Sequence, residues 1–331
     1  MNICIIFGGS GYIGSKIVER FLDNKQFDKI IQVDIQKPTI TFDNVEFIKA
    51  DVRESLLKLP ISRKEISSEN SWIFNLAAIH REPGHKQKEY FDTNIKGAEH
   101  ITEFANSIGI KNIFFTSSIA PYGLSVEERE EDSMLYSETP YGISKGYAEK
   151  IHQLWQTKEN DKRLIICRPS VIYGPGDPGN ILRMIKAIKS GFFFYPGDST
   201  IIKGYGYIYG LLDSIEFTCF EKSQMLITYN YAENPIVPMK DLGTIIKRSL
   251  GIKRIILTIP TTLLVIVTSI VYTIGKPFGK FSSIHPVRVK KAGFPTNVKP
   301  KYLIDNGFNF KYGFEESLKH WMKHTPNDFD K

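Results

Sequence analysis

The sequence predicts an α/β protein with a doubly wound parallel sheet. Three observations support this prediction. Short apolar runs alternate with amphipathic segments through the first half of the chain, which is the pattern of repeated βαβ units. A glycine-rich turn follows the first run, and an acidic residue ends the second. With 331 residues, the chain is long enough for one or two domains with a large core.

The first apolar run, Ile3 to Phe7, is expected to form a buried strand. Glycines follow at Gly8, Gly11 and Gly14, before an amphipathic segment over residues 15–22. In a strand–turn–helix unit such glycines allow a sharp reversal, a close approach of the backbone to a pyrophosphate, and close packing of the helix. The helix N-terminus then offers free N–H groups and a positive dipole end to phosphates. Alone this turn is a weak signal, since similar turns often bind nothing.

The second apolar run, residues 30–33, ends in Asp34, twenty residues after Gly14. An acid at this distance accepts hydrogen bonds from the adenosine ribose hydroxyls of a dinucleotide. Its negative charge would also repel a 2′-phosphate. We therefore predict a Rossmann-type domain that binds NAD rather than NADP.

The third run, residues 45–48, is followed by Asp51 and Val52. Asp51 has two compatible interpretations: it hydrogen-bonds the adenine amino group, or it caps a helix over residues 53–59.

The fourth run, residues 72–76, leads into Ala77 and Ala78. Small residues at the carboxyl end of a central strand leave room for a cofactor to lie against backbone.

A polar loop with His80, Arg81 and His85 comes next. No third ligand lies at a sensible spacing for a metal site, whereas Arg81 is a candidate for a phosphate contact. Asn94 opens the helical pattern over residues 95–105, either as a cofactor-binding residue or as its cap.

The fifth run, residues 112–115, is followed by the hydroxyl residues 116–118, which should lie at the carboxyl edge of the sheet like the residues after the fourth run. Downstream, Pro140 suits the start of a helix, and Tyr141 and Lys145 then share one face of it. A cation beside a phenol favours the phenolate and lowers its pKa from about 10. A tyrosine tuned in this way can remove a proton from a sugar hydroxyl near neutral pH.

Taken together, these motifs resemble those of the extended short-chain dehydrogenase/reductase family, in its NAD-dependent sugar epimerase/dehydratase branch. The resemblance covers essentially the whole chain. It rests on residues 8–14, Asp34, Asp51-Val52, residues 76–78, residues 116–118, the Tyr141–Lys145 pair and residues 168–174. Phe7 departs from the threonine usual in the family, which should matter little because phosphate binding uses backbone.

The resemblance implies that Ser118, Tyr141 and Lys145 are catalytic, and that Lys145 also bonds the nicotinamide ribose. The expected cofactor-binding residues are Gly8, Gly11, Tyr12, Ile13, Gly14, Asp34, Asp51, Val52, Leu76, Ala77, Ala78, Asn94, Tyr141, Lys145 and Pro169. The expected substrate-binding residues are Arg81, Asn180, Arg183 and Arg288. No metal site is expected.

The resemblance also indicates the reaction. Dehydratases of the family carry an Asp-Glu pair just beyond the fifth-strand hydroxyls, and here Ile119 and Ala120 stand at those positions. Neither can transfer a proton, so dehydration is disfavoured, and Asp34 disfavours an NADPH-dependent reductase. Epimerisation through a transient 4-keto sugar fits best, with NAD regenerated in each turnover.

A narrower resemblance is to the bacterial epimerases that interconvert N-acetylglucosamine and N-acetylgalactosamine on undecaprenyl diphosphate, in the biosynthesis of surface polysaccharide (O-antigen or capsule). It rests on residues 78–81, residues 168–173, Gly179-Asn180, and an apolar segment leading to residues 287–291. Two alternatives stay open. The protein could be an epimerase of UDP-glucose or UDP-N-acetylglucosamine, or a non-catalytic NAD-binding sensor on the same fold.

The family pattern places the NAD-binding domain in residues 1–175, with residues 205–232 returning to it. Residues 176–204 and 233–331 then form a smaller C-terminal substrate domain, including an apolar helix over residues 261–274. Asn180 and Arg183 open its first helix, where Asn180 either contacts the sugar diphosphate or is a plain N-cap.

Residues 255–274 carry no charge, which at first suggests a transmembrane helix. A helix that starts after Pro260 spans only about 21 Å, however, against a bilayer core of about 30 Å. A buried helix, a helix lying in the membrane interface and a short span are the three interpretations.

The composition fits a protein of the cytoplasm, at the inner face of the plasma membrane if it contacts lipid. The first residues already form a core strand, so no signal peptide is expected, and the three cysteines suit small buried hydrophobes in a reducing compartment. The net charge is +7, and cations crowd the C-terminal third, which indicates a scattered solvated face or a surface for phosphates or anionic lipid. Expected partners are the sugar diphosphate, a peripheral membrane contact and a second copy of the chain, but no nucleic acid.

Overall fold

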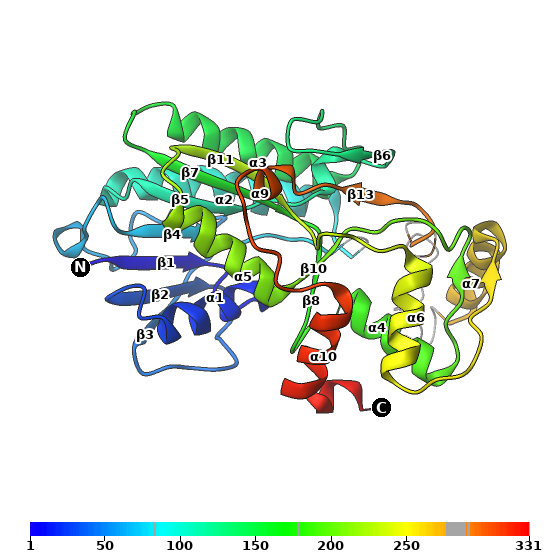
Figure 1. Cartoon of the computed structure of the whole chain (residues 1–331). Coiled ribbons are helices and arrows are strands. Elements are labelled where there is room, and N and C mark those ends of the chain that lie inside the picture. Colours follow the sequence, from blue (N-terminus) through cyan, green and yellow to red (C-terminus); the bar gives the residue numbers. More distant parts are fainter. Residues whose placement is uncertain (82–83, 178, 276–288, 290–291, 331) are drawn as a thin grey trace.

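The computed structural model describes residues 1–81, 84–177, 179–275, 289 and 292–330 (Figure 1). Arg288, an expected substrate ligand, lies outside the described residues.

A parallel sheet of seven strands forms the centre of the molecule, in the order β11-β7-β5-β4-β1-β2-β3. The strands are β1 (Ile3–Phe7), β2 (Lys29–Asp34), β3 (Val45–Lys49), β4 (Trp72–Asn75), β5 (Asn112–Thr116), β7 (Arg163–Pro169) and β11 (Leu226–Tyr231). The strand order reverses between β1 and β4, which is the point where a doubly wound sheet binds its ligand. The predicted α/β fold with a doubly wound sheet is therefore confirmed.

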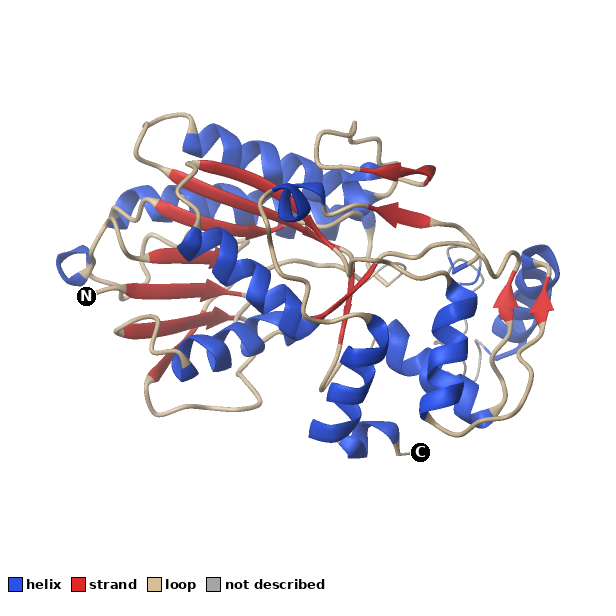
Figure 2. Ribbon diagram, viewed as in Figure 1, coloured by secondary structure: helices blue, strands red, loops and turns tan. Residues whose placement is uncertain are grey.

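Helices cover both faces of this sheet (Figures 1 and 2). They are α1 (Tyr12–Asp23) and α5 (Ile208–Glu216) on one face, and α2 (Gln87–Ile108) and α3 (Pro140–Gln156) on the other. The alternation of strand side chains explains the two cores: Cys4 and Ile6 face α1, whereas Ile5 and Phe7 face α2.

Most of the C-terminal elements lie beyond the carboxyl ends of the strands (Figure 1). They are α4 (Asn180–Ser190), α6 (Met239–Ser249), α7 (Thr261–Gly275) and α10 (Phe314–His324), whereas α9 (Lys301–Asp305) packs against β11. Three short parallel pairs join them to the rest: β8 (Val171–Tyr173) with β10 (Tyr205–Tyr207), β9 (Tyr195–Pro196) with β12 (Thr258–Ile259), and β6 (Ser125–Arg129) with β13 (Thr296–Val298). Single turns complete the chain at η1 (Arg63–Glu65), η2 (Ala120–Tyr122), η3 (Phe217–Glu221) and η5 (Pro326–Phe329).

The apolar segment of the C-terminal part is α7, with the bounds that the sequence predicted to within one residue. The interpretation as a buried helix is wrong, because residues 261–274 are all at least partly exposed. Within the described part of the chain, no helix has both the length and the apolar character needed to cross a membrane.

The three cysteines, Cys4, Cys167 and Cys219, are free and buried. Burial raises the pKa of each thiol, so all three stay protonated and behave as small apolar side chains.

Candidate active site

The glycine turn between β1 and α1 has the shape that the sequence predicted. Gly8 has a φ of +77°, and a Cβ there would lie 2.7 Å from the backbone nitrogen of Ala77. At Gly14 a Cβ would lie 2.4 Å from the carbonyl oxygen of Gly8, so only glycine lets α1 pack against the turn. Gly11, the N-cap of α1, meets only the Gly8 carbonyl within 4 Å. The first N–H groups of α1, from Tyr12 and Ile13, are of the kind that an α-helix leaves without intrahelical partners, so this turn forms a cradle that can bind a phosphate.

Asp34 lies at the end of β2, beside this turn. Its carboxylate accepts hydrogen bonds from the backbone N–H of Ser10 (3.1 Å) and of Gln36 (3.0 Å). Gln32 also donates to the carbonyl of Gly9 (2.9 Å), which ties β2 to the turn. The carboxylate is thus fixed next to the cradle with lone pairs to spare for ribose hydroxyls.

Asp51 follows β3 in a turn and not at the start of a helix, so the helix considered for residues 53–59 is wrong. Its carboxylate accepts from the backbone N–H and the guanidinium of Arg53 (2.9 Å and 3.0 Å), and these bonds lower the pKa of Asp51. The carbonyl of Val52 bonds the ring of His100 (2.8 Å). Hydrogen bonds to nearby residues therefore satisfy the polar groups of this segment, in place of the helix that was one interpretation of the sequence.

The segment after β4 is fixed to the turn and to α2. Leu76 donates to the carbonyl of Phe7 (2.9 Å), and Ala77 lies against Gly8. Asn94 does not cap α2, which begins seven residues earlier at Gln87. Its side chain instead bonds both the N–H and the carbonyl of Ile79 (2.9 Å and 3.2 Å) and the hydroxyl of Ser144 (2.8 Å).

Ser118 follows β5 in a loop that is anchored on β7. The loop N–H groups of Ser117 and Ile119 donate to the carbonyls of Cys167 (2.7 Å) and Pro169 (3.2 Å). The hydroxyl of Ser118 accepts from the backbone N–H of Ala120 (3.1 Å). Pro169 therefore contributes its backbone to the placement of this loop.

Tyr141 and Lys145 lie in the first two turns of α3. Thr139 caps the helix by accepting from the N–H of Gly142 (3.2 Å), and Pro140 is its first residue. At Gly142 a Cβ would lie 2.6 Å from the carbonyl of Ala120. The absence of a side chain there lets the start of α3 lie directly against the loop that carries Ser118.

Lys145 is buried, and its ammonium donates to the carbonyl of Thr116 (2.6 Å) while lying 4.3 Å above the ring of Phe115. Loss of hydration lowers the pKa of Lys145 to about 7, although the nearby Glu149 opposes this shift. The lysine therefore changes charge near neutral pH.

His152 was not identified from the sequence, and it supports the ring under Lys145. It stacks on Phe115 with ring centroids 4.2 Å apart. Its Nδ1 bonds the carbonyl of Ala148 (2.7 Å), and its Nε2 accepts from the amide of Asn75 (3.2 Å). Burial lowers the pKa of His152 to about 4, so the ring is neutral at physiological pH.

A buried ion pair that the sequence analysis missed joins α3 to β7. Arg168 donates twice to Glu149 (2.9 Å and 2.7 Å), and the hydroxyl of Ser117 donates to the same carboxylate (2.5 Å). Arg168 also bonds the hydroxyl of Tyr122 (2.8 Å), which donates in turn to Asn230 of β11 (2.8 Å). Two features of the sequence could have indicated this pair. Glu149 lies one helical turn after Lys145, and Arg168 opens the motif of residues 168–174.

His80 lies beside Lys145 as well. Burial, with the charges of Arg81, Lys145 and His85, lowers the pKa of His80. The carbonyl of Arg81 accepts from the hydroxyl of Tyr90 (2.5 Å), whose ring lies 6.4 Å from that of Tyr141. The loop after β4 is thus linked through Tyr90 to the neighbourhood of Tyr141. The side chain of Arg81 in this loop is exposed. The described residues hold no group of three potential metal ligands.

On the C-terminal side, Gly179 is the N-cap of α4, so the interpretation of Asn180 as a plain N-cap is wrong. Asn180 is the first helical residue, and its amide oxygen accepts from the guanidinium of Arg183 (2.6 Å). The carboxyl of Asp177 lies next to Gly179, and burial raises the pKa of Asp177 to about 6.

The fold and the cradle define a dinucleotide-binding enzyme of the extended short-chain dehydrogenase/reductase class. The model of the NAD dependent epimerase/dehydratase family matches residues 4–210, and the chain belongs to this family. NAD is the family's cofactor, and the glycine cradle with Asp34 beside it fits NAD in this chain. The predictions of family and cofactor are therefore confirmed.

Relatives and solved structures agree with this assignment. The chain is 27% identical to the N-acetyl-alpha-D-glucosaminyl-diphospho-ditrans,octacis-undecaprenol 4-epimerase of Escherichia coli O157:H7, over 98% of this chain and 96% of the relative. It is 24% identical to the UDP-glucose 4-epimerase of Vibrio cholerae, over 56% of this chain and 57% of the relative. In fold it is similar to the UDP-glucuronic acid 4-epimerase of Bacillus cereus in complex with NAD, with a TM-score of 0.75 at 16% identity, covering 99% and 100% of the two chains.

Proposed function

We propose that the protein is an NAD-dependent sugar 4-epimerase that interconverts N-acetylglucosamine and N-acetylgalactosamine on undecaprenyl diphosphate, in surface polysaccharide biosynthesis. The observation that carries the chemistry is the buried Lys145, whose ammonium is held on the carbonyl of Thr116 and which lies in α3 one turn after Tyr141. The substrate assignment is supported by the extent of similarity. The undecaprenol-linked relative matches over nearly the full length of both chains, whereas the UDP-glucose epimerase of Vibrio cholerae matches over about half.

In the proposed reaction Tyr141 is the general base that removes the proton of the sugar C4 hydroxyl and later returns it. Bound NAD supplies reversible oxidation of the C4 carbon. Ser118 orients the hydroxyl. Lys145 carries three N–H donors when charged; one is used on Thr116, and the others serve the cofactor ribose and favour the phenolate of Tyr141.

The two residues after Ser118 support epimerisation over dehydration. Ile119 directly precedes η2, and Ala120 is its first residue and donates its N–H to the hydroxyl of Ser118. A dehydratase must protonate a leaving hydroxyl, and neither side chain carries a proton to donate.

Cationic and amide groups would hold the diphosphate. We assign this role to Arg81 of the loop after β4, and to Asn180, Arg183 and Arg288 of a substrate domain formed by residues 176–204 and 233–331. The NAD-binding domain would then comprise residues 1–175 and 205–232. The bond between Arg183 and Asn180 orients both groups at the start of α4, where the helix dipole also favours an anion.

The test compares two substrates with the same purified protein. We expect conversion of polyprenyl-diphosphate-linked N-acetylglucosamine to the galacto epimer, and little conversion of UDP-N-acetylglucosamine. The Tyr141→Phe variant should lose about 10²–10⁴-fold in rate while still binding NAD. Efficient turnover of the UDP-sugar alone would instead establish a nucleotide-sugar epimerase, and NAD binding without turnover of either substrate would favour a sensor.

A further inference from the structure

α7 carries an apolar stripe that faces solvent. Its exposed side chains are those of Leu263, Ile266, Val267, Ile270 and Ile274. Intervals of three and four residues place these side chains along one side of the helix. The opposite side carries Leu264, Val265 and Val271 together with Thr268, and it is only half-buried. A helix normally turns such an apolar stripe towards a protein core or lipid, so this stripe lacks the environment that its composition requires.

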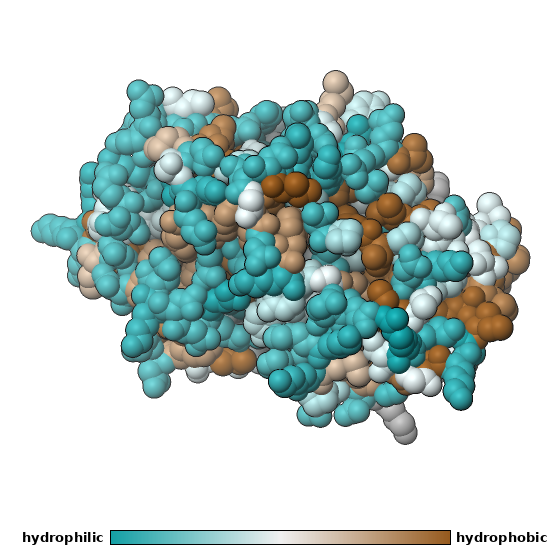
Figure 3. Space-filling model, in the orientation of Figure 1, coloured by the Kyte–Doolittle hydropathy of each residue, from teal (hydrophilic) through white to brown (hydrophobic). Residues whose placement is uncertain are grey.

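Two neighbouring segments extend the stripe. Phe192, after α4, is 80% exposed, and Ile255, before β12, is 78% exposed. The pairing of β9 with β12 holds the two segments together. Figure 3 shows apolar side chains gathered at this end of the molecule, over β12 and α7. We call this surface, made of the exposed apolar side chains of residues 192–194, 255–257 and 263–274, the apolar tip.

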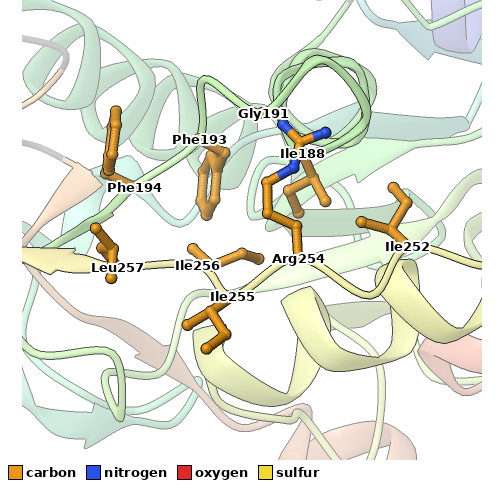
Figure 4. A pocket seen from close by; sticks show the side chains of 9 residues that line it. All are labelled: Ile188, Gly191, Phe193, Phe194, Ile252, Arg254, Ile255, Ile256 and Leu257. Atoms are coloured by element: carbon orange, nitrogen blue, oxygen red, sulfur yellow. The ribbon is translucent and has the colours of Figure 1, made fainter.

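A cavity of about 190 Å³ opens within the tip. It is lined by Ile188, Gly191, Phe193, Phe194, Ile252, Arg254, Ile255, Ile256 and Leu257 (Figure 4). The guanidinium of Arg254 packs directly on Gly191, the left-handed C-cap of α4, where the helix dipole favours a cation. Every other lining side chain is apolar, so the cavity suits a hydrocarbon segment lying beside a cation.

The two stretches of chain that supply the tip carry only basic charges, although one of these cations, Arg248, pairs with Glu315 of α10. No acidic residue occurs between Asp241 and Asp305, or between Asp177 and Asp198. These two stretches supply the tip, and their described cations include Lys186, Lys189, Lys247, Arg248, Lys253 and Arg254. A large exposed apolar patch marks a surface with a partner, and a cationic surround selects an anionic one.

We infer that the apolar tip docks onto an anionic phospholipid bilayer, lying in the interface without crossing it. The 15 residues of α7 span about 22 Å, which is short of the bilayer core of about 30 Å. A second copy of the chain would bring cations against cations, which disfavours dimerisation through this face. A bilayer satisfies both features, since its hydrocarbon takes the apolar side chains and its headgroups meet the cations. This inference deepens the proposed function, because it places the protein where a lipid-linked sugar resides.

Flotation with vesicles tests the inference. The whole protein should float with vesicles containing phosphatidylglycerol, and binding should fall with added salt and in vesicles of phosphatidylcholine alone. The variant with Ile266, Ile270 and Ile274 changed to serine should partition at least tenfold more weakly. The matched control changes three exposed apolar residues outside the tip, Ile40, Leu57 and Val126, to serine, and should float like the wild type.

The inference is overturned if the wild type stays at the bottom of the gradient, if the tip and control variants float equally, or if the tip variant changes oligomeric mass instead of flotation. Unchanged NAD affinity and melting temperature show that the variants are folded. The test is independent of the proposed activity. A protein that floats but converts no sugar contradicts only the epimerase, whereas conversion of a short-chain, water-soluble polyprenyl-diphosphate sugar without flotation contradicts only the docking.

Discussion

Lys145 is the residue whose surroundings have the clearest chemical consequence. It is buried, and its pKa is lowered to about 7 from an ordinary value of 10.5. Between these values the folded chain binds fewer protons at this site than the unfolded chain. The stability contributed by the group therefore rises with pH in this window and is lost as pH falls towards 7.

We therefore predict a pH-dependent difference between wild type and Lys145→Met in the absence of NAD. The variant should be more stable than wild type near pH 6.5, and the difference in unfolding free energy should shrink by pH 9.5. Urea denaturation at the two pH values measures it. An exposed lysine on the same helix, changed in Lys150→Met, provides the control and should show no such trend. A difference that is constant with pH would mean that Lys145 is not desolvated.

Asp34 supports a second prediction at the same scale. Because its carboxylate is fixed beside the glycine turn, the wild type should bind NAD at least tenfold more tightly than NADP. Asp34→Asn should narrow this ratio by removing the charge that repels a 2′-phosphate. Calorimetric titration with both dinucleotides measures the ratio, with Asp43→Asn, in the loop between β2 and β3, as the control. Equal affinities in the wild type would contradict the prediction.

Among the elements, α3 has a strict steric requirement at its first turn. A Cβ at Gly142 would lie 2.6 Å from the carbonyl of Ala120, whereas a Cβ at Gly146, one turn later, has its nearest neighbour at 3.9 Å. Gly142→Ala should therefore push Tyr141 away from the loop of Ser118 and lower the epimerisation rate at least tenfold.

The matched variant Gly146→Ala should keep full activity and raise stability by about 0.5–1 kcal/mol, the usual gain when alanine replaces glycine inside a helix. Steady-state rates and melting temperatures of the two variants provide the comparison. If both variants had the same activity, the steric account of the α3 start would be wrong.

The comparison of sequence and structure is clearest for these elements. The strands were predictable because each is a short apolar run with turn residues at its end, and the Tyr141–Lys145 helix because Pro140 and its periodicity are local signals. Asn94, Glu149 and His152 were missed or misplaced, since their partners lie far away in sequence. The position of α7 was also open, because an apolar run has the same appearance whether a core or a bilayer covers it.

For the whole molecule, the C-terminal segment closes onto the loop that begins α4. The carboxylate of Asp328 accepts from the indole of Trp321 (2.7 Å) and from the backbone N–H of Gly176 (3.1 Å). Trp321 is fully buried against Phe329 and Tyr173. The last residues of the chain thus fix a loop near the proposed diphosphate site.

Asp328→Ala should therefore raise the KM for the sugar several-fold with little change in kcat or in NAD affinity. Initial-rate kinetics at saturating NAD separate these parameters. Asp330→Ala, two residues away, serves as the control. A variant with reduced NAD affinity but normal KM would show that the segment acts on the cofactor side instead.

The buried pair of Arg168 and Glu149 also bears on how the protein is made. Tyr122, which accepts a hydrogen bond from Arg168 of this pair, needs Asn230 of β11 as the acceptor for its own hydroxyl proton. The side chain of Glu131 accepts from the backbone N–H of Asn230 as well (2.9 Å). During synthesis, the glycine turn can form soon after β1 and α1 leave the ribosome. The loop of Ser118 must wait for more than a hundred further residues, until β11 emerges. A nascent chain would accordingly acquire the dinucleotide cradle well before it acquires a finished reaction centre.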